Sequence, residues 1–232
     1  MCGRYTLSTS PEEIAAEFAD DLALAGIAPL AETFEWEPRY NIAPSQYSLV
    51  CVEQDQEPIF KAMRWGLIPH WAKDEKIGYK LINARAETVA EKPSFRTAFK
   101  RRRCIVFSDG YYEWTKQVSG KQPVYIQPLN ATVMPFAGLW EQWQHPEKGP
   151  LQTFSIITIG ANAELEKIHH RMPVVLDPRQ CQQWLSAESE PEAIFPLLQP
   201  APNGTFTYSF VSTFVNSPRH EGPQCIQAIA EN

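Results

Sequence analysis

The 232-residue chain has no long apolar run, no paired cysteines and none of the common nucleotide-binding signatures. No hydrophobic stretch approaches the roughly 18 residues of a membrane-spanning helix, and the N-terminus resembles neither a signal peptide nor a transit peptide. We therefore expect no membrane partner and a cytoplasmic protein, associated with the nucleoid in a bacterium or located in the nucleus of a eukaryote.

The five cysteines are dispersed, and none belongs to a C-x-x-C pair. Such spacing provides neither a disulfide framework nor the ligands of a zinc site, so we expect reduced thiols, no metal and no cofactor. Walker A, G-x-G-x-x-G, G-x-S-x-G and H-E-x-x-H patterns are also missing. Their absence argues against the nucleotide-binding enzymes, hydrolases and metalloproteases that depend on them.

The net charge of −6 argues against a general nucleic-acid binder, but the charge is unevenly distributed. Residues 1–59 contain two basic and eleven acidic residues, whereas residues 60–105 contain twelve basic and four acidic residues. This basic segment includes Trp65 and Trp71 and ends in the run 100–103, Lys-Arg-Arg-Arg. Cations interleaved with aromatic residues suit phosphates and unstacked bases, which favours a single-stranded nucleic acid as the partner. A solvated charged face is the alternative.

What is present is a composition typical of a globular protein, with 44% hydrophobic and 12% aromatic residues. Hydrophobic periodicity and turn residues predict one α+β domain over residues 1–232, with residues 26–46 irregular and residues 65–71 forming a shaped loop. We predict helices over 11–25, 92–100, 177–185 and 190–198, and strands over 47–52, 58–65, 104–107, 111–115, 123–127, 133–139, 154–159, 172–176 and 206–212.

The first five residues, Met1-Cys2-Gly3-Arg4-Tyr5, contain the most distinctive chemistry. Removal of Met1 would leave Cys2 with a free amine and a thiol on adjacent carbons, and these titrate near about 7.7–8.0 and about 8.5. An aldehyde condenses with such an amine to a Schiff base, and the sulfur then closes a five-membered thiazolidine. A chance cysteine in a mobile terminus is the alternative interpretation.

Three polar residues stand in otherwise apolar stretches. Asn83 follows Leu-Ile, Glu113 lies between aromatic residues, and His169 follows Ile168. A half-buried polar group needs a partner, so each is either a structural hydrogen-bonding residue or a site residue. Together with Cys2 they would supply a nucleophile, a carboxylate, an imidazole and an amide.

Six short blocks carry a resemblance to a known family: Met1-Cys2-Gly3-Arg4-Tyr5, Arg39-Tyr40-Asn41-Ile42-Ala43-Pro44, Trp65-Gly66-Leu67-Ile68-Pro69-x-Trp71, Ile82-Asn83-Ala84-Arg85-x-Glu87-Thr88, Asp109-Gly110-Tyr111-Tyr112-Glu113-Trp114 and His169-x-Arg171-Met172-Pro173-Val174. In this order they resemble the SOS-response-associated peptidase (SRAP) family of abasic-site processing proteins. A further match is Val211-Ser212-x-x-Val215-Asn216. The resemblance implies a mostly antiparallel, barrel-like β core with flanking helices.

The resemblance also implies a reaction. Members of the family lose the initiator methionine and use the terminal cysteine, here Cys2, to capture the aldehyde of an abasic site in single-stranded DNA as a thiazolidine crosslink. Asn83 would hold the Cys2 terminus, Glu113 would deprotonate its amine, and His169 would protonate the sugar oxygen. His170 replaces a residue that is often acidic in the family. Since neighbouring side chains of an extended segment point to opposite sides, we assign catalysis to His169.

The partner implied by the resemblance is single-stranded DNA containing abasic sites, bound by a monomer. Positions matching DNA contacts of the family are Arg4, Asn41, Pro44, Trp71, Arg85 and Arg171. A peptidase activity that removes Met1, or the crosslinked peptide, is implied by the family name. Two other classes stay open on the residues themselves: an N-terminal-nucleophile cysteine peptidase or hydrolase, and a non-catalytic binder of single-stranded nucleic acid.

Overall fold

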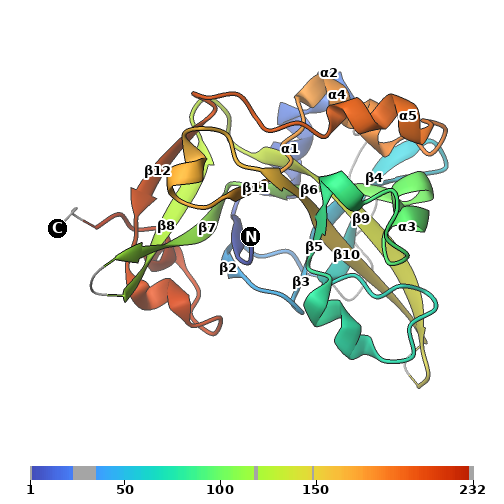
Figure 1. Ribbon diagram of the computed structural model, residues 1–232, viewed down its shortest axis with the longest axis horizontal. Helices are drawn as coiled ribbons and strands as arrows, with labels where there is room; N and C mark the ends of the chain where they lie inside the picture. The colour runs from blue at the N-terminus through green and yellow to red at the C-terminus, as the bar shows by residue number, and fades with distance from the viewer. Residues whose placement is uncertain (1, 23–34, 118–119, 148, 230–232) are drawn as a thin grey trace.

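The computed structural model describes residues 2–22, 35–117, 120–147 and 149–229. The strands in these ranges form two sheets, one with seven strands and one with five (Figure 1). Five strands of the larger sheet form a closed ring, because the last of them pairs with both ends of the series: β4 (Glu57–Trp65), β3 (Tyr47–Gln54), β6 (Arg103–Ser108), β9 (Met134–His145) and β10 (Gly149–Gly160). This ring is the barrel-like core.

Two short strands continue the larger sheet along β10. β5 (Asn83–Arg85) pairs parallel with residues 156–158 of β10, and β11 (Arg171–Pro173) pairs antiparallel with residues 158–160. Both strands therefore reach the same end of β10. Arg85 and Pro173 both pair with Thr158, so the two strands flank the same part of β10.

The smaller sheet contains the start of the chain. Its strands are antiparallel and follow the order β12 (Phe206–Phe210), β8 (Gly120–Pro128), β7 (Gly110–Gln117), β1 (Tyr5–Leu7) and β2 (Arg39–Ile42). β1 lies between two other strands although it has only three residues. Figure 1 shows the beginning of the chain near the centre of the molecule, between the two sheets.

Aromatic rings join β1 to the barrel. The Tyr5 ring packs edge-on against Trp65 with 5.1 Å between the centroids, and Trp65 stacks on Phe154 at an interplanar angle of 7°. All three side chains are fully or almost fully buried. Because large buried aromatics contribute strongly to packing energy, this contact fixes the position of the residues that precede Tyr5.

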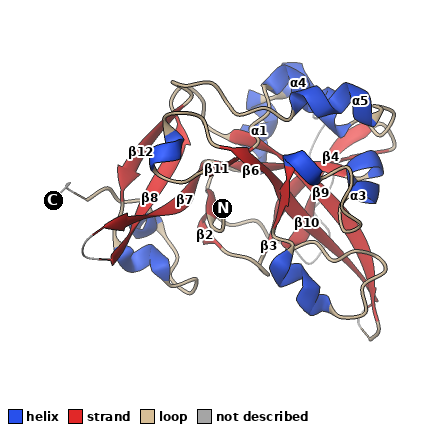
Figure 2. Cartoon of the chain, viewed as in Figure 1, coloured by secondary structure: helices blue, strands red, loops and turns tan. Residues whose placement is uncertain are grey.

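The helices are short and lie on the outside of the sheets (Figure 2). Capping boxes begin two of them, with Ser10 and Glu13 in one and Asp177 and Gln180 in the other. The α-helices are α1 (Pro11–Glu17), α2 (Ala19–Leu22), α3 (Arg96–Arg101), α4 (Pro178–Leu185) and α5 (Pro191–Ile194). The 3₁₀ helices are η1 (Glu75–Lys80), η2 (Ala86–Thr88), η3 (Leu165–Lys167), η4 (Phe195–Leu197), η5 (Thr213–Asn216) and η6 (Pro223–Cys225). No helix in the described ranges is long and apolar enough to cross a membrane.

The α+β class and the mostly antiparallel, barrel-like core are confirmed. Several element boundaries are wrong. The helix predicted over 11–25 is interrupted at Phe18, and residues 23–25 lie outside the described residues. The helix predicted over 92–100 begins only at Arg96, and the one over 190–198 becomes 3₁₀ after Ile194. The strand predicted over 172–176 ends at Pro173, with only Val175 adding an isolated bridge to Phe136.

Candidate active site between the two sheets

Cys2 is completely buried just before β1. Its thiol lies 3.9 Å from the carbonyl oxygen of Arg4, and burial raises the thiol pKa far above its ordinary range. The sulfur is therefore protonated at neutral pH. Since Met1 precedes Cys2 in the chain, the nitrogen of Cys2 is an amide, and a free α-amine requires removal of Met1.

Asn83 holds the Cys2 backbone from the opposite sheet. Its Nδ2 donates a hydrogen bond of 2.8 Å to the Cys2 carbonyl oxygen, and β5 positions it through its parallel pairing with Ile156 of β10. Asn83 Oδ1 is buried and has no hydrogen-bond partner among the described residues. A buried acceptor without a partner is energetically costly, so a donor brought to this atom would be bound favourably.

Glu113 and His169 approach each other from different elements. Glu113 lies on β7 with only 5% of its side chain exposed, and His169 follows η3; Oε1 and Nδ1 are 3.8 Å apart. Burial raises the pKa of the Glu113 carboxyl and lowers that of the His169 imidazole. His169 Nδ1 lies 3.0 Å from the backbone nitrogen of Arg171, from which it can accept, and 3.2 Å from the Arg171 carbonyl oxygen, to which a protonated Nδ1 can donate.

The assignment of catalysis to His169 was based on an extended segment, and that premise is wrong. The chain turns after η3, so the rings of His169 and His170 lie side by side, with centroids 4.3 Å apart and planes inclined by 31°. His170 is exposed, and its pKa is lowered chiefly by the neighbouring His169. His169 Nδ1 lies 3.8 Å from Glu113 Oε1, and burial raises the pKa of Glu113 although the charge of His170 lowers it.

An open depression of about 430 Å³ adjoins these residues and is lined by Arg4, Glu113, Trp114, Lys121, His169 and Asn216. Trp114, Lys121 and Asn216 were not predicted as site residues. Trp114 and Asn216 lie within the recognised blocks, which is the signal that could have identified them. The indole Nε1 of Trp114 donates to Asn216 Oδ1 at 2.7 Å, so these two side chains form one wall.

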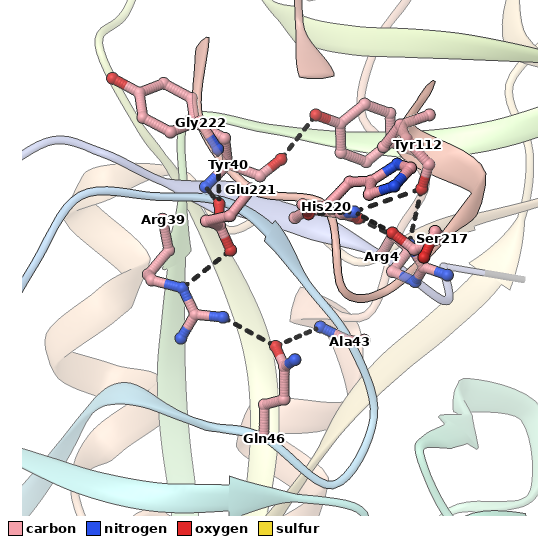
Figure 3. A network of polar contacts seen from close by, with 12 residues as sticks. Arg4, Arg39, Tyr40, Ala43, Gln46, Tyr112, Ser217, His220, Glu221 and Gly222 are labelled. Carbon is pink, nitrogen blue, oxygen red and sulfur yellow. Dashed lines mark hydrogen bonds and ion pairs between the residues drawn. The ribbon is translucent and has the colours of Figure 1, made fainter. Parts of the chain in front are cut away.

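Arg4 contributes its guanidinium to this depression but is also bound within the protein. Nη1 donates to Asn41 Oδ1 at 2.6 Å and to the Val215 carbonyl at 2.8 Å, while Nη2 donates to the Asn216 carbonyl. The guanidinium also lies over the Trp114 ring, 5.9 Å from its centroid. Arg4 therefore connects β1 to the C-terminal segment, and Figure 3 shows it beside Ser217 and His220.

Asn41 differs from its predicted role. Its side chain is completely buried, so it offers no surface along which a DNA strand could run. Nδ2 instead donates to the carbonyl oxygens of Val215, Ser217 and His220, and Oδ1 accepts from Arg4. Tyr40 and Arg39 bind Glu221 of the same segment (Figure 3). The 212–222 segment is thus attached to β2 by a buried polar network.

The other predicted DNA contacts are more accessible, with one exception. Trp71 is half exposed, Arg85 is exposed and Pro44 is partly exposed. The Trp71 loop is fixed from below, because Trp143 donates its indole N–H to the Ala72 carbonyl at 2.7 Å. The Arg171 side chain is only 11% exposed, and its guanidinium binds Glu87 and the Thr158 carbonyl. Most of its donors are therefore already used.

The basic run 100–103 does not form one charged surface. Arg103 is buried, stacks on Trp184 and donates to five backbone carbonyl oxygens, those of Phe99, Lys100, Trp184, Ser186 and Ser189. Arg102 binds Glu141, and only Lys100 and Arg101 are exposed. A large part of the local positive charge therefore stabilises the fold.

Comparison with known proteins identifies the family. Residues 1–218 match the model of the family described as SOS response associated peptidase (SRAP). The abasic site processing protein YoqW of Bacillus subtilis is 42% identical over 98% of this chain and 100% of its own. The abasic site processing protein HMCES of Gallus gallus is 33% identical over 99% of this chain and 78% of its own. A crystal structure of a Bacteroides thetaiotaomicron protein, 28% identical, superposes with a TM-score of 0.87 over 99% of this chain and 100% of its own. The chain belongs to the SRAP family.

Proposed function

We propose that this protein processes abasic sites in DNA by forming a covalent crosslink through Cys2. The relatives named as abasic site processing proteins support the general role. The observation that carries the mechanism is the arrangement around Cys2: Asn83 binds its carbonyl from β5, while Glu113 and His169 meet beside it from β7 and from the segment before β11. A carboxylate and an imidazole beside a terminal aminothiol can carry the proton transfers of thiazolidine formation.

The reaction begins once Met1 has been removed. Glu113 takes a proton from the Cys2 ammonium, and the neutral amine attacks the aldehyde carbon of the ring-opened abasic sugar. His169 donates a proton to the sugar oxygen, and loss of one water leaves a Schiff base. The Cys2 sulfur then adds to the carbon of the C=N bond while its proton passes to the nitrogen. The product is a thiazolidine, formed from amine, thiol and aldehyde with the release of one water.

The order of these steps follows from burial. Because burial keeps the Cys2 thiol protonated, the amine is the first nucleophile and the sulfur acts second. The raised pKa of Glu113 makes its carboxylate a stronger base than an exposed glutamate. Asn83 Oδ1, buried and without a described partner, is suited to accept an N–H of the new terminal amine.

The substrate we propose is single-stranded DNA, bound by a monomer with one domain over residues 1–232. An abasic sugar must reach a buried sulfur, which a stacked and paired strand would hinder. Exposed Trp71 and Arg85, with Arg4 and Lys121 in the depression, provide stacking and phosphate-binding groups along the approach.

The test is incubation of processed protein with a single-stranded oligonucleotide carrying one abasic site, followed by a denaturing gel. We expect a shifted band with the wild type and none with Cys2→Ala. Cys2→Ala and Cys2→Ser both keep the amine, so each should yield a shifted band only after borohydride reduction of the Schiff base. Protein that retains Met1 has no free amine beside the Cys2 thiol, so it cannot close the thiazolidine and should give no shifted band without reduction. An equal shift with Cys2→Ala and wild type would refute the crosslink, whereas turnover of peptides without any crosslink would favour the cysteine peptidase.

A further inference from the structure

A second exposed aromatic surface lies on the 212–222 segment and has no role in the proposed chemistry. Phe214, in η5, is 37% exposed, and its ring stacks on that of His220 with 4.0 Å between the centroids and 13° between the planes. His220 is less exposed than Phe214. One face of Phe214 is therefore covered by an imidazole, and the rest of the ring is available to a ligand.

This ring pair is held rigidly. His220 Nδ1 lies 2.6 Å from the Phe214 carbonyl oxygen, which can only accept, so Nδ1 donates. Ser212 caps η5. The buried Asn41 binds the carbonyl of Val215, which follows Phe214, and the carbonyl of His220 itself. Because the ring is already ordered, a ligand that stacks on it loses little additional conformational freedom.

The pair is also connected directly to the candidate active site. η5 ends at Asn216, which lines the depression together with Arg4 and is bound by Trp114. Arg4 donates to the carbonyls of Val215 and Asn216, one and two residues after Phe214. Phe214 is therefore two residues from a side chain that lines the depression, and its segment is bound by the cation of that depression.

We propose, building on the function above, that Phe214 backed by His220 is a stacking platform for an unpaired base next to the abasic nucleotide. An aromatic ring accepts the face of any base, and Arg4, Lys121 and the exposed Arg219 supply positive charge for the neighbouring phosphates. Trp71 lies on a different loop, after β4, so the strand would be held by aromatic side chains from two separate segments.

The experiment places 2-aminopurine at each of the four nearest positions in turn, two on each side of the abasic site, and records its fluorescence. Stacking on Phe214 should quench one of these positions more strongly than the others. Phe214→Ala and Phe214→Leu should remove that quenching, and Phe214→Trp should retain it. Leucine distinguishes base stacking from apolar packing, because it keeps bulk but has no aromatic face. Phe195→Ala is the matched control, since Phe195 is 45% exposed in η4 and lies outside the site.

Loss of stacking on this base should also change the DNA concentration that crosslinking requires. Phe214→Ala should raise the DNA concentration for half-maximal crosslinking roughly 5- to 150-fold, the factor expected for one base–aromatic stack. Replacing the quenched nucleotide by a tetrahydrofuran spacer should weaken the wild type similarly and abolish the effect of Phe214→Ala. Equal quenching by wild type and Phe214→Ala at all four positions would overturn the platform. If the wild type forms no crosslink, the proposed function fails, and quenching by the Cys2→Ala protein still tests the platform.

Discussion

Replacing Asn41 by alanine should destabilise the protein strongly, because its side chain is the centre of a buried polar network. The change removes the Nδ2 amide group, whose two protons are shared among the carbonyls of Val215, Ser217 and His220 at 3.2, 2.9 and 2.8 Å, and the Oδ1 acceptor for Arg4. A buried group left unsatisfied costs about 1–3 kcal/mol, and a partly buried hydrogen bond contributes about 0.5–1.5 kcal/mol. Val215 keeps its bond from Arg4, so the loss comes from the two partly buried bonds to Ser217 and His220, about 1 kcal/mol each, and from the charged bond of Arg4, about 2 kcal/mol. We therefore expect a loss of about 4 kcal/mol in the free energy of unfolding.

Urea denaturation followed by fluorescence measures this loss. At roughly 2–3 kcal/mol per M, the midpoint should fall by roughly 1–2 M without a change in slope. Asn41→Asp has the same shape but turns the donor into an acceptor facing three carbonyl oxygens, so at neutral pH it should be at least as destabilising. Asn203→Ala, at an exposed position, is the control and should change stability by less than about 0.5 kcal/mol.

The result also separates two roles for Asn41. If this residue contacted DNA directly, alanine would weaken DNA binding while leaving the urea midpoint unchanged. The buried network predicts instead that stability falls first. Crosslinking then requires more DNA, because the 212–222 segment with Asn216 is no longer held in place. A midpoint within about 0.3 M of the wild type for both Asn41 variants would refute the reasoning.

Three further predictions concern charged residues. Glu113→Gln should slow crosslinking, yet it should raise the melting temperature at neutral and alkaline pH and leave it unchanged below pH 4. The reason is that burial raises the pKa of Glu113 in the folded state. The contribution of Glu113 to stability is therefore present at low pH and is lost as pH rises through that pKa. A plot of crosslinking rate against pH should be bell-shaped. Glu113→Gln should remove the fall in rate at low pH, and His169→Ala should remove the fall at high pH. Single-turnover rates measured across this pH range would show whether either fall persists in the variants. Arg103→Met should lower the melting temperature while DNA affinity in a binding titration stays the same, whereas a Lys100→Ala, Arg101→Ala double variant should leave stability unchanged; the opposite pattern would mean that Arg103 faces DNA.

The elements with strong local signals were predicted correctly in kind. The capping boxes at Ser10 and Asp177 begin helices, and the apolar run at 154–159 lies within β10. The short strands were missed because local sequence carries little information about them. β1 and β5 have three residues each, and they are strands only because β7, β2 and β10 provide hydrogen-bond partners from distant parts of the chain. Residues 39–42, which we predicted to be irregular, form β2 for the same reason.

Charge patterns were the least reliable guide to surface. Arg103 was assigned to a nucleic-acid-binding segment on its charge pattern, and Asn41 was assigned to the DNA path by the family resemblance; both are buried with their donors directed at backbone carbonyls. A sequence shows that a cation or an amide is present, but it does not show which carbonyl oxygens lack donors in the folded chain. Three of the five carbonyls that Arg103 binds lie 81 to 86 residues further along the chain, and the three that Asn41 binds lie 174 to 179 residues further along.

The reactive group itself is a property of the sequence, because an amine and a thiol on adjacent carbons follow from Cys2 once Met1 is removed. The family is also recognisable from the sequence, because the short blocks occur along the chain in the order that the family has. The surroundings of Cys2 are a property of the tertiary structure. Burial that keeps the thiol protonated, the 2.8 Å bond from Asn83 and the 3.8 Å approach of His169 to Glu113 exist only where two sheets meet. The pKa shifts of these groups come from desolvation, which depends on everything packed around a residue and not on its neighbours in the chain.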